Sequence, residues 1–556
     1  MQTPNDKNTV PPNVDKLPAM TRKVISIKPA AALPETVELQ SKIKTQPRKT
    51  KSAFDALGYK ATIENLHQEI QALYEADEVP WILGYSGGKD STATLQLIWS
   101  AITKVDVDKR KKKIFVISTD TLVENPIVSA WVSSSLDVMS QAAVSQALPV
   151  VPKLLHPKVE DSFWVNLIGR GYPAPRPKFR WCTERLKIRP SNKFISDVVT
   201  ENGEAILCLG ARREESVARA KVLDKNTRYR VRDRLSPSAT LPGCQIYTPV
   251  EAWTSDDIWF YLNNEKNPWG ASNKELMGMY AGASADGECP LVVDTSTPSC
   301  GDSRFGCWVC TLVEKDKSMT AMIQNDADKE WMMPLLDLRN ALDFRNGSAG
   351  DENTNDHNLR DFRRMTGSVQ LMSAGKSIPG PYTQESRETW LAKLLTAQCH
   401  IRKNGPTDVG SIRLISIEEL QEIRRIWVAD KHELEDSLPR IYEKFTGERY
   451  PGRPLDDNLV IGEEEMSTLL ELCENDRLHY ELSRELLSVT RQQRSSGRRA
   501  GLFENIEKAF RRHFFDDRDD AIARAQHISD ERRRQSSRRD LNAFGQEPPN
   551  TVESNK

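Results

Sequence analysis

Between residue 63 and about residue 209, short apolar runs alternate with segments of helical period. Apolar residues at steps of three and four predict a helix over about 63–74, namely Ile63, Leu66, Ile70 and Leu73. The run 79–83 is apolar throughout and is typical of a buried parallel strand. A glycine-rich turn over 84–88 follows it directly and leads into a second predicted helix over 91–102.

The same alternation continues down the chain. It predicts strands over 113–118, 150–154 and 205–209 and a helix over about 125–147. Strands that alternate with helices predict an α/β fold with an open, mostly parallel sheet. Ligands of such sheets bind at the carboxyl ends of the strands. We therefore expect the glycine turn, Asp120, Arg212 and Arg213 to share one edge of the sheet.

The length and composition are typical of a protein with several domains and a highly charged surface. The chain has 556 residues, of which 38% are hydrophobic and 28% charged. We expect five regions: a disordered segment over 1–52, an α/β nucleotide domain over 53–275, a cysteine-rich region over 276–325, a helical domain over 326–482 and a charged, arginine-rich tail over 483–556. No apolar run reaches the length of a membrane span, and the N-terminus has no apolar signal core, so we expect a cytoplasmic protein without a membrane partner.

The charge is unevenly distributed. The net charge is only -1, which indicates no overall bias toward nucleic acid. Between Arg491 and Arg512, however, seven Lys or Arg residues stand against two Glu. This stretch and the later run 532–534 indicate either contact with DNA phosphates or a charged, exposed helix.

The glycine turn has the chemistry of a phosphate-binding loop. It reads Ser-Gly-Gly-Lys-Asp-Ser over 86–91, and Gly87 and Gly88 allow the backbone to approach a phosphate closely. Backbone N–H groups and the start of the following helix attract an anion. Lys89 adds a positive charge, and Ser86 and Ser91 add hydroxyl donors.

The residue after the lysine separates this loop from a Walker A loop. Walker A requires Ser or Thr after its lysine, whereas Asp90 follows Lys89 here. A carboxylate beside phosphates repels them unless a cation intervenes, so Asp90 predicts a bound Mg²⁺.

A group of cysteines predicts a metal centre. The four residues fall within 22 positions, namely Cys289, Cys300, Cys307 and Cys310. Four thiolates suit either tetrahedral zinc or an iron–sulfur cluster, and their spacing does not choose between the two.

Cys182 stands apart from this group. It lies among Arg180, Arg185 and Lys187, whose charges are expected to lower its pKa and favour a reactive thiolate. The alternative is a small packing residue near the edge of the sheet.

Several segments resemble known families. Residues 86–91 match the signature of the N-type ATP pyrophosphatases and the related phosphoadenylyl sulfate (PAPS) reductases. Further similar segments extend this resemblance over about 81–262; they are 118–121 with Glu124, 180–187, 210–216 and 247–259. A narrower resemblance, over about 50–460, is to the DndC family of bacterial DNA phosphorothioation. It rests on 300–310, 380–383, 390–391, 426–427 and 431–433.

The resemblance implies an ATP pyrophosphatase of the PP-loop type that acts as a sulfurtransferase on DNA. Such a protein cleaves ATP to AMP and pyrophosphate while sulfur replaces a non-bridging oxygen of a DNA phosphate. It carries a [4Fe–4S] cluster on the four cysteines, and its partners are DNA, a cysteine desulfurase that donates sulfur, and the other Dnd proteins. The implied catalytic residues are Lys89, Asp90, Cys182 and Arg212, and the implied nucleotide-binding residues are 86–91, Asp120 and Arg213.

Three other functions stay open. A PAPS-reductase-like enzyme acts on a small sulfur nucleotide, and a tRNA-thiolating enzyme shares the same activation chemistry. A scaffold that binds DNA and senses a nucleotide keeps the fold without turnover.

Overall fold

The computed structural model describes residues 51–177, 179–228, 234–283, 305–344, 356–372, 376–455, 460–492 and 501–544. The segment 1–50, almost all of the N-terminal segment expected to be disordered, lies outside these ranges. Cys289 and Cys300 also lie outside them. Within these ranges, no helix combines the length and the apolar character that a membrane span needs.

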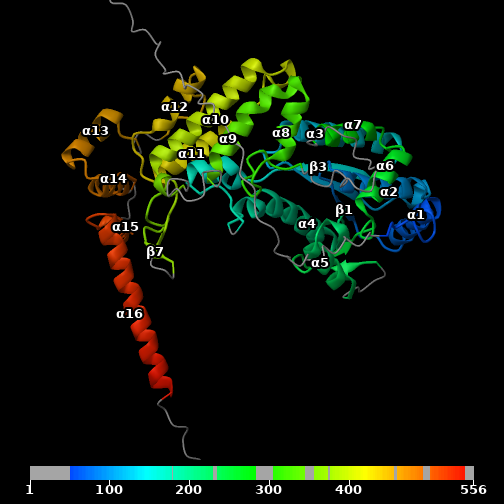
Figure 1. The fold of residues 1–556 in the computed structure, drawn as a ribbon, viewed down its shortest axis with the longest axis horizontal. Helices are drawn as coiled ribbons and strands as arrows, with labels where there is room; N and C mark the ends of the chain where they lie inside the picture. The colour runs from blue at the N-terminus through cyan, green and yellow to red at the C-terminus, as the bar shows by residue number, and fades with distance from the viewer. Residues whose placement is uncertain are drawn as a thin grey trace, which may run out of the picture. The chain divides into compact units, whose positions relative to one another are not determined.

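A six-stranded sheet with the strand order β3-β2-β1-β4-β6-β5 forms the N-terminal part of the described chain (Figure 1). The strands are β1 Trp81–Gly84, β2 Ile114–Thr119, β3 Val150–Leu155, β4 Ala205–Cys208, β5 Ser236–Pro237 and β6 Cys244–Tyr247. All neighbouring pairs are parallel except β5 and β6. This topology confirms the expected open, mostly parallel α/β sheet, including the four strands that the apolar runs predict.

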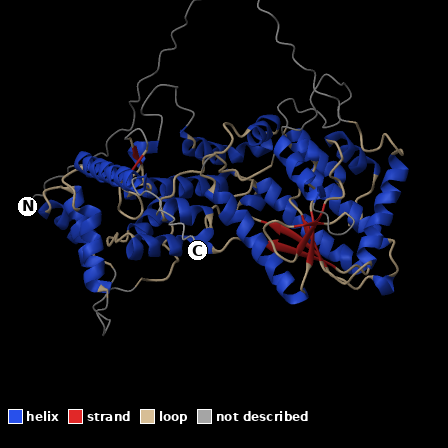
Figure 2. Ribbon diagram, turned by 90° about the horizontal axis from the view of Figure 1, so that it is seen from below, coloured by secondary structure: helices blue, strands red, loops and turns tan. Residues whose placement is uncertain are grey.

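Helices cover both faces of this sheet, as Figure 2 shows. They are α1 Tyr59–Glu75, α2 Lys89–Thr103, α3 Pro126–Ser145, α4 Arg189–Asn202, α5 Val217–Arg228, α6 Ser255–Asn264 and α7 Asn273–Gly282. Successive residues of β1 enter different cores. Trp81 and Leu83 pack with α1, α2, α3 and α6, whereas Ile82 packs with α4. The side chains of a strand alternate between its faces, so continuous apolar runs are what a sheet buried on both sides requires.

Local sequence sets where two of these helices begin. The Asn125 side chain accepts a hydrogen bond from the Ile127 N–H (3.0 Å), and Pro126 occupies the first helical position of α3. Thr254 and Asp257 cap each other reciprocally at the start of α6, with hydrogen bonds of 2.9 and 3.1 Å. These caps end the short loops 120–125 and 248–254, which connect β2 to α3 and β6 to α6.

The rest of the described chain is largely helical. Its helices are α8 Lys317–Asn325, α9 Met333–Leu342, α10 Gln384–Asn404, α11 Ile417–Arg425, α12 Ser437–Thr446, α13 Glu463–Leu472, α14 Arg477–Gln492, α15 Leu502–His513 and α16 Arg518–Phe544. A short hairpin joins β7 Gln370–Leu371 to β8 Ser377–Ile378. Short 3₁₀ and π segments complete the fold: η1 Val107–Lys109, η2 Val159–Asp161, η3 Val165–Gly169, η4 Thr183–Ile188, η5 Arg213–Glu215, η6 Ala327–Met332, η9 Asp356–Leu359, η10 Thr407–Val409 and η11 Ile426–Asp430.

This helical part shares a core with the segment that follows β3. Leu391, Ile423 and Trp427 pack in one apolar cluster with Trp164 and Leu167. The Trp427 indole N–H also donates a hydrogen bond of 3.0 Å to the Ile168 carbonyl. Trp253, Trp259, Trp390 and Trp427 are all buried, so these rings belong to the core.

The charged C-terminal region is in part folded onto the helical one. Helix α14 runs across the boundary expected at 482/483. Arg512 and His513 at the end of α15 contact the two oxygens of Glu485 in α14, at 2.9 and 2.8 Å. Arg498 and Arg499 lie outside the described residues. Contact of this region with DNA stays a prediction.

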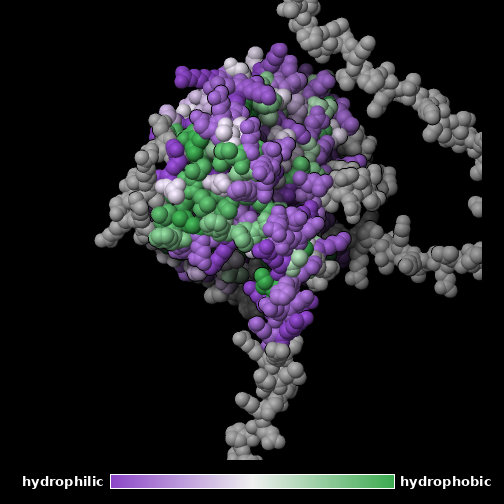
Figure 3. Space-filling model, turned by 90° about the vertical axis from the view of Figure 1, so that its left-hand side faces the viewer, coloured by the Kyte–Doolittle hydropathy of each residue, from purple (hydrophilic) through white to green (hydrophobic). Residues whose placement is uncertain are grey.

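Apolar side chains also reach the surface. Exposed large hydrophobic residues on α13, α14 and α15 include Leu472, Leu487, Phe503 and Phe510. Figure 3 shows a face of the molecule on which hydrophobic residues gather within a hydrophilic surround. Apolar patches of this kind are typical of surfaces that meet another molecule.

Candidate active site

The glycine loop runs from the end of β1 to the first residue of α2. Gly87 has a φ of 73°, and a Cβ added there would lie 2.5 Å from Val132 Cγ2 in α3, so only glycine fits. Gly88 precedes the helix and has no side chain with which to cap it. The start of α2 therefore presents the positive end of its dipole to a ligand, although the Lys89 N–H donates to the Tyr280 hydroxyl. The hydroxyls of Ser86 and Ser91 lie 3.2 Å from each other beside this helix start.

Lys89, Asp90 and Arg212 form a chain of charges at the same point. Lys89 Nζ lies 3.2 Å from Asp90 Oδ2, and Arg212 Nε lies 2.7 Å from Asp90 Oδ1. Arg212 is only 4% exposed, and its Nη1 also donates to Glu214 Oε2 at 3.1 Å. The end of β4 approaches α2 closely enough that a Cβ on Gly210 would lie 2.7 Å from the Asp90 carbonyl oxygen. The fold thus brings together three residues that the sequence assigns to catalysis.

This arrangement changes the argument for Mg²⁺. Each carboxylate oxygen of Asp90 already faces a positive charge from the protein. The repulsion between Asp90 and phosphates, from which the cation was inferred, is therefore offset by Lys89 and Arg212. A Mg²⁺ ion stays a prediction, and it rests only on the affinity of nucleotide phosphates for that ion.

Tyr280 of α7 packs against the glycine loop at the start of α2. Its hydroxyl accepts a hydrogen bond of 3.2 Å from the Lys89 N–H, and its ring packs edge to face with Phe305. Burial raises the pKa of Tyr280, so the phenol stays protonated. Tyr280 is 191 positions from Lys89, and no signal in the sequence connects the two.

A cavity of about 1240 Å³ opens over this loop. Of the predicted residues, those that line it are Ser86, Gly88, Lys89, Asp90, Ser91, Asp120 and Arg212. They come from the carboxyl ends of β1, β2 and β4, as the rule for open sheets predicts. Ligand pockets for molecules the size of a drug span roughly 300–1,000 Å³. The cavity therefore has room for a nucleotide and part of a second substrate.

Arg213 does not line this cavity. Its guanidinium pairs with Asp224 of α5, and its Nη2 lies 3.7 Å from Glu251 Oε1. Arg213 therefore ties η5 to α5, whereas its neighbour Arg212 faces the glycine loop. Arg212 has extended backbone and precedes η5, whereas Arg213 is the first residue of that 3₁₀ helix, so the two side chains leave in different directions. The sequence alone does not show which of the two arginines faces the ligand.

Cys307 and Cys310 lie on one turn beside the wall of the cavity. The Cys310 N–H donates to the Cys307 carbonyl at 3.0 Å, and Cys307 Sγ lies 3.3 Å from Thr121 Oγ1. The backbone of Cys307 forms an isolated antiparallel β-bridge with that of Glu124, and Glu124 lines the cavity. Both thiols are free. Among the residues that the structure describes, no group of three or more His, Cys, Asp or Glu is placed to hold a metal ion.

Arg339 of α9 holds the backbone that follows this turn. Its side chain is fully buried, and it donates to the carbonyls of Cys310 and Glu314, both at 3.1 Å, as well as to that of Val313. Its Nη2 also pairs with Asp343 Oδ2 at 3.1 Å. Arg339 therefore positions the end of the cysteine turn. The i, i+4 spacing to Asp343 is a weak signal by which the sequence could have indicated it.

For Cys182 the structure corrects one expectation. Burial raises its pKa, and the nearby Cys310 adds to the effect, so the prediction of a lowered pKa is wrong. The basic residues around it have other partners: Arg185 Nη1 lies 3.0 Å from Asp161, and Lys187 Nζ lies 3.2 Å from Glu124. Cys182 does not line the large cavity. A catalytic role for Cys182 stays a prediction.

A parallel sheet whose first strand passes through a Gly-Gly turn into a helix, below a large cavity, defines a nucleotide-binding α/β domain of the PP-loop type. More particularly, residues 80–271 match the family model of the phosphoadenosine phosphosulfate reductase domain. The chain therefore carries a PAPS reductase-like domain, which extends from β1 to beyond α6. The segments that resemble the DndC family, from Cys300 to Glu433, lie outside the matched range, so that resemblance stays a prediction.

Two further similarities are more distant. The chain is 27% identical over 248 residues to an uncharacterized protein of Methanocaldococcus jannaschii, over 44% of this chain and 39% of that protein. The chain thus matches about two fifths of the length of this relative. Among solved structures, it is similar to the U34-tRNA thiolase NcsA from Methanococcus maripaludis with its [4Fe–4S] cluster. That similarity has 14% sequence identity and a TM-score of 0.25, and it covers 51% of this chain and 80% of the thiolase chain.

Proposed function

We propose that the protein is a sulfur-transfer enzyme that uses ATP to activate an oxygen atom of its acceptor and releases AMP and pyrophosphate. The observation that carries this proposal is the start of α2, whose N-cap residue Gly88 has no capping side chain. This helix start lies below the large cavity with Lys89, Ser86 and Ser91 around it. A helix start with hydroxyl donors and one lysine suits the polyphosphate of a nucleotide. The PAPS reductase-like domain supports a nucleotide substrate in sulfur chemistry.

The residues suggest how the chemistry proceeds. The acceptor oxygen attacks the α-phosphorus of ATP, and the bond to the β-phosphate breaks, so that pyrophosphate leaves. Lys89 and the backbone N–H groups of the loop stabilise the charge that develops on the phosphoryl oxygens. A sulfur nucleophile then attacks the adenylated centre, and AMP leaves with the original oxygen. Asp90 acts as a positioning residue because it holds both Lys89 and Arg212.

The acceptor we propose is a phosphate of the DNA backbone, as in DNA phosphorothioation. The resemblance of 300–310, 380–383 and 431–433 to the DndC family supports this acceptor. The cavity volume supports an acceptor beyond the nucleotide itself. The partners that follow are DNA, a cysteine desulfurase and the other Dnd proteins. Arg213 is left out of the nucleotide site because it pairs with Asp224 outside the cavity.

A [4Fe–4S] cluster forms part of the proposal, and the described residues fit it. Cys307 and Cys310 supply two free thiols on one turn, next to the cavity. Burial raises the pKa of Cys307 to about 12, so the free thiol is protonated, and a bound metal would displace that proton. The remaining ligands would be Cys289 and Cys300, which lie outside the described residues. Such a cluster supplies iron that binds sulfur or transfers electrons.

Pyrophosphate release by the full chain, purified without oxygen, tests the proposal. The assay contains ATP and either no acceptor, double-stranded DNA or bulk tRNA. Release that depends on DNA, together with phosphorothioate linkages found by mass spectrometry after nuclease digestion, would support the proposal. The linkages require added sulfide or a cysteine desulfurase. Release that depends on tRNA alone would contradict a DNA acceptor and favour tRNA thiolation. ATP binding without any release of pyrophosphate would favour a DNA-binding scaffold that only senses the nucleotide.

The cluster gives a separate prediction. We expect wild-type protein prepared without oxygen to hold about four irons and four sulfides, as a [4Fe–4S] site does. Cys307→Ser should lose most of the iron because one ligand is missing. Cys399→Ser is the matched control, because Cys399 is a free, partly exposed cysteine in α10. Metal and sulfide analysis with an absorption spectrum measures the result. One zinc per chain, or equal iron in the Cys307 variant, would contradict the prediction.

A further inference from the structure

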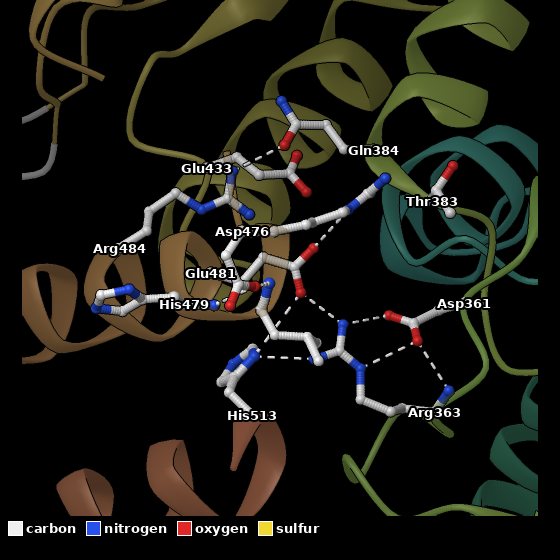
Figure 4. Close-up of polar contacts among 12 residues, drawn as sticks. Asp361, Arg363, Thr383, Gln384, Glu433, Asp476, His479, Glu481, Arg484 and His513 are labelled. Atoms are coloured by element: carbon white, nitrogen blue, oxygen red, sulfur yellow. Dashed lines mark hydrogen bonds and ion pairs between the residues drawn. The ribbon is translucent and has the colours of Figure 1, made fainter. Parts of the chain in front are cut away.

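A second cavity, of about 210 Å³, lies in the helical part of the protein. It is bounded by the start of α10, the turn after η11, helix α14 and the loop that contains Asp361 and Arg363 (Figure 4). Two of the segments singled out in the sequence, 380–383 and 431–433, contribute to its lining. The proposed reaction gives neither of them a role.

The lining of this cavity carries an excess of positive charge. Eight Lys or Arg residues face five Asp or Glu residues. The cations are Arg170, Arg363, Arg364, Arg387, Lys431, Arg477, Arg484 and Arg512, and the acids are Asp361, Asp430, Glu433, Glu481 and Glu485. A cleft lined by an excess of one sign of charge attracts ions of the opposite sign.

The carboxylates are already paired with other side chains. Figure 4 shows Arg363 between Asp361 and Glu481, with contacts of 2.7 and 2.5 Å from Nη2. Glu433 pairs with Arg387, and Glu485 pairs with Arg512 and His513. Asp430 lies 3.1 Å from Arg425, outside the cavity. These pairs use the negative charge of the lining, and no carboxylate of the described residues forms an ion pair with Arg170, Arg364 or Lys431.

Arg170, Lys431 and Arg484 are the cations with unused donors. Within the described part of the chain, Nε of Arg170 and Nε of Arg484 are buried atoms without a hydrogen-bond partner. Arg484 is only 7% exposed; its Nη1 donates to Gln384 Oε1 at 2.8 Å and lies 3.6 Å from Glu435 Oε1, so only its Nε is left for a ligand. No hydrogen bond or ion pair to Lys431 Nζ is formed by the described residues. Buried donors without partners are rare in proteins and call for a ligand or ordered water.

Lys431 shows how strongly the site lacks an anion. Burial lowers its pKa to about 8, and the charge of Arg387 on α10 contributes in the same direction. Glu433, Asp361 and Asp430 oppose this shift without restoring the usual pKa of a lysine. An anion in the cavity would stabilise the ammonium form.

We propose that this cavity is an anion site that binds one phosphate group through Arg170, Lys431 and Arg484. Guanidinium and ammonium donors that converge on one space are the groups proteins use for phosphate. The volume of about 210 Å³ is below the range of roughly 300–1,000 Å³ for pockets that enclose a drug-sized ligand. The cavity therefore suits a phosphate group rather than an entire nucleotide. The group comes either from a polynucleotide backbone or from a free phosphate.

Thermal unfolding of the full chain tests the site. Unfolding temperatures are compared in inorganic phosphate and in chloride of equal ionic strength, since a ligand that binds only the folded state raises that temperature. All proteins carry Lys89→Ala, so that the loop lysine is absent throughout. The variants are Lys431→Met and Arg170→Gln, and the matched control is Lys393→Met, because Lys393 is exposed on α10.

We expect phosphate to stabilise the parent and Lys393→Met equally. In Lys431→Met and Arg170→Gln, phosphate should bind about ten to a hundred times more weakly, since hydrogen bonds to a charged group are lost. Without phosphate, Lys431→Met should be at least as stable as its parent, because methionine fills a similar volume and removes a half-buried charge that has no carboxylate partner. Equal stabilisation by phosphate in all variants would overturn the proposal. So would a marked loss of stability in Lys431→Met, since that result would make Lys431 a structural residue.

A labelled DNA duplex distinguishes the two sources of phosphate. Its affinity is measured by fluorescence anisotropy over a series of salt concentrations. If the group belongs to a polynucleotide, Lys431→Met binds DNA more weakly and the slope of log affinity against log salt falls by about one. If only the response to inorganic phosphate changes, the site takes a free phosphate. Neither measurement requires ATP turnover, so the result is independent of the proposed reaction.

Discussion

Replacing Lys89 with alanine should lower kcat/KM for ATP-dependent pyrophosphate release by about 10²–10³-fold, the usual effect of losing one donor to a developing oxyanion. Lys89 lies at the first position of α2 and lines the large cavity. Its ammonium is 3.2 Å from Asp90, which fixes it near the helix start. A coupled assay of pyrophosphate measures the change.

The control for this variant is Lys104→Ala. Lys104 follows the end of the same helix, with its side chain 46% exposed and paired with Glu64 at 2.8 Å. Its loss should leave pyrophosphate release unchanged. If Lys89→Ala turned over ATP at the wild-type rate, the glycine loop would not be the site of the reaction.

Asp90→Asn distinguishes positioning from direct contact with ATP. The variant keeps the shape of the side chain but removes the charge that holds Lys89 and Arg212. If Asp90 acts through these two residues, the fall in activity should be smaller than that of Lys89→Ala. If Asp90 binds an essential Mg²⁺ ion, a higher Mg²⁺ concentration should restore part of the activity.

The second large effect concerns stability. Arg387→Met should lower the free energy of unfolding by about 3–5 kcal/mol, the usual cost of removing one partner of a buried ion pair. Arg387 and Glu433 are 2% and 3% exposed, and both guanidinium Nη atoms contact the carboxylate. The guanidinium also lies 5.2 Å from the centre of the Trp427 ring. Unfolding in urea, followed by fluorescence, measures the loss.

Two further variants define the cause. Arg425→Met breaks ion pairs with Glu422 and Asp430; because the arginine side chain is 46% exposed, the loss should cost at most about 1 kcal/mol. The double variant Arg387→Met with Glu433→Leu removes both charges and should recover much of the lost stability. If Arg387→Met cost no more than Arg425→Met, the pair would not stabilise the contact between α10 and the turn after η11.

Local patterns were enough to predict the sheet domain. The predicted helix over 63–74 corresponds to α1, and the strand over 113–118 corresponds to β2 within a residue at each end. The glycine turn follows β1 as expected, but α2 begins at Lys89, two residues before the predicted start, so that residues 89–91 form its first turn. These elements depend on the spacing of apolar residues, on glycine flexibility and on helix start signals, all within about 15 residues of chain. They can therefore be predicted from the sequence alone.

The make-up of the candidate site was predictable only in part. The rule that ligands bind at strand ends correctly placed Asp120 and Arg212 beside the cavity. It placed Arg213 there as well, although that residue faces Asp224. The expected lower pKa of Cys182 was inferred from neighbouring charges in the sequence, which carry no information on burial, and burial raises that pKa.

The sequence by itself therefore determined the order of strands and helices along the chain and the phosphate-binding character of one loop. Only the tertiary structure decided which residues meet there. Arg212 reaches Asp90 across 122 positions, and Tyr280 reaches Lys89 across 191. It also decided that Lys431 lies in a cavity without an anionic partner. The physical reason is that these contacts depend on packing between distant elements, whereas period, turns and caps depend on neighbours in the chain.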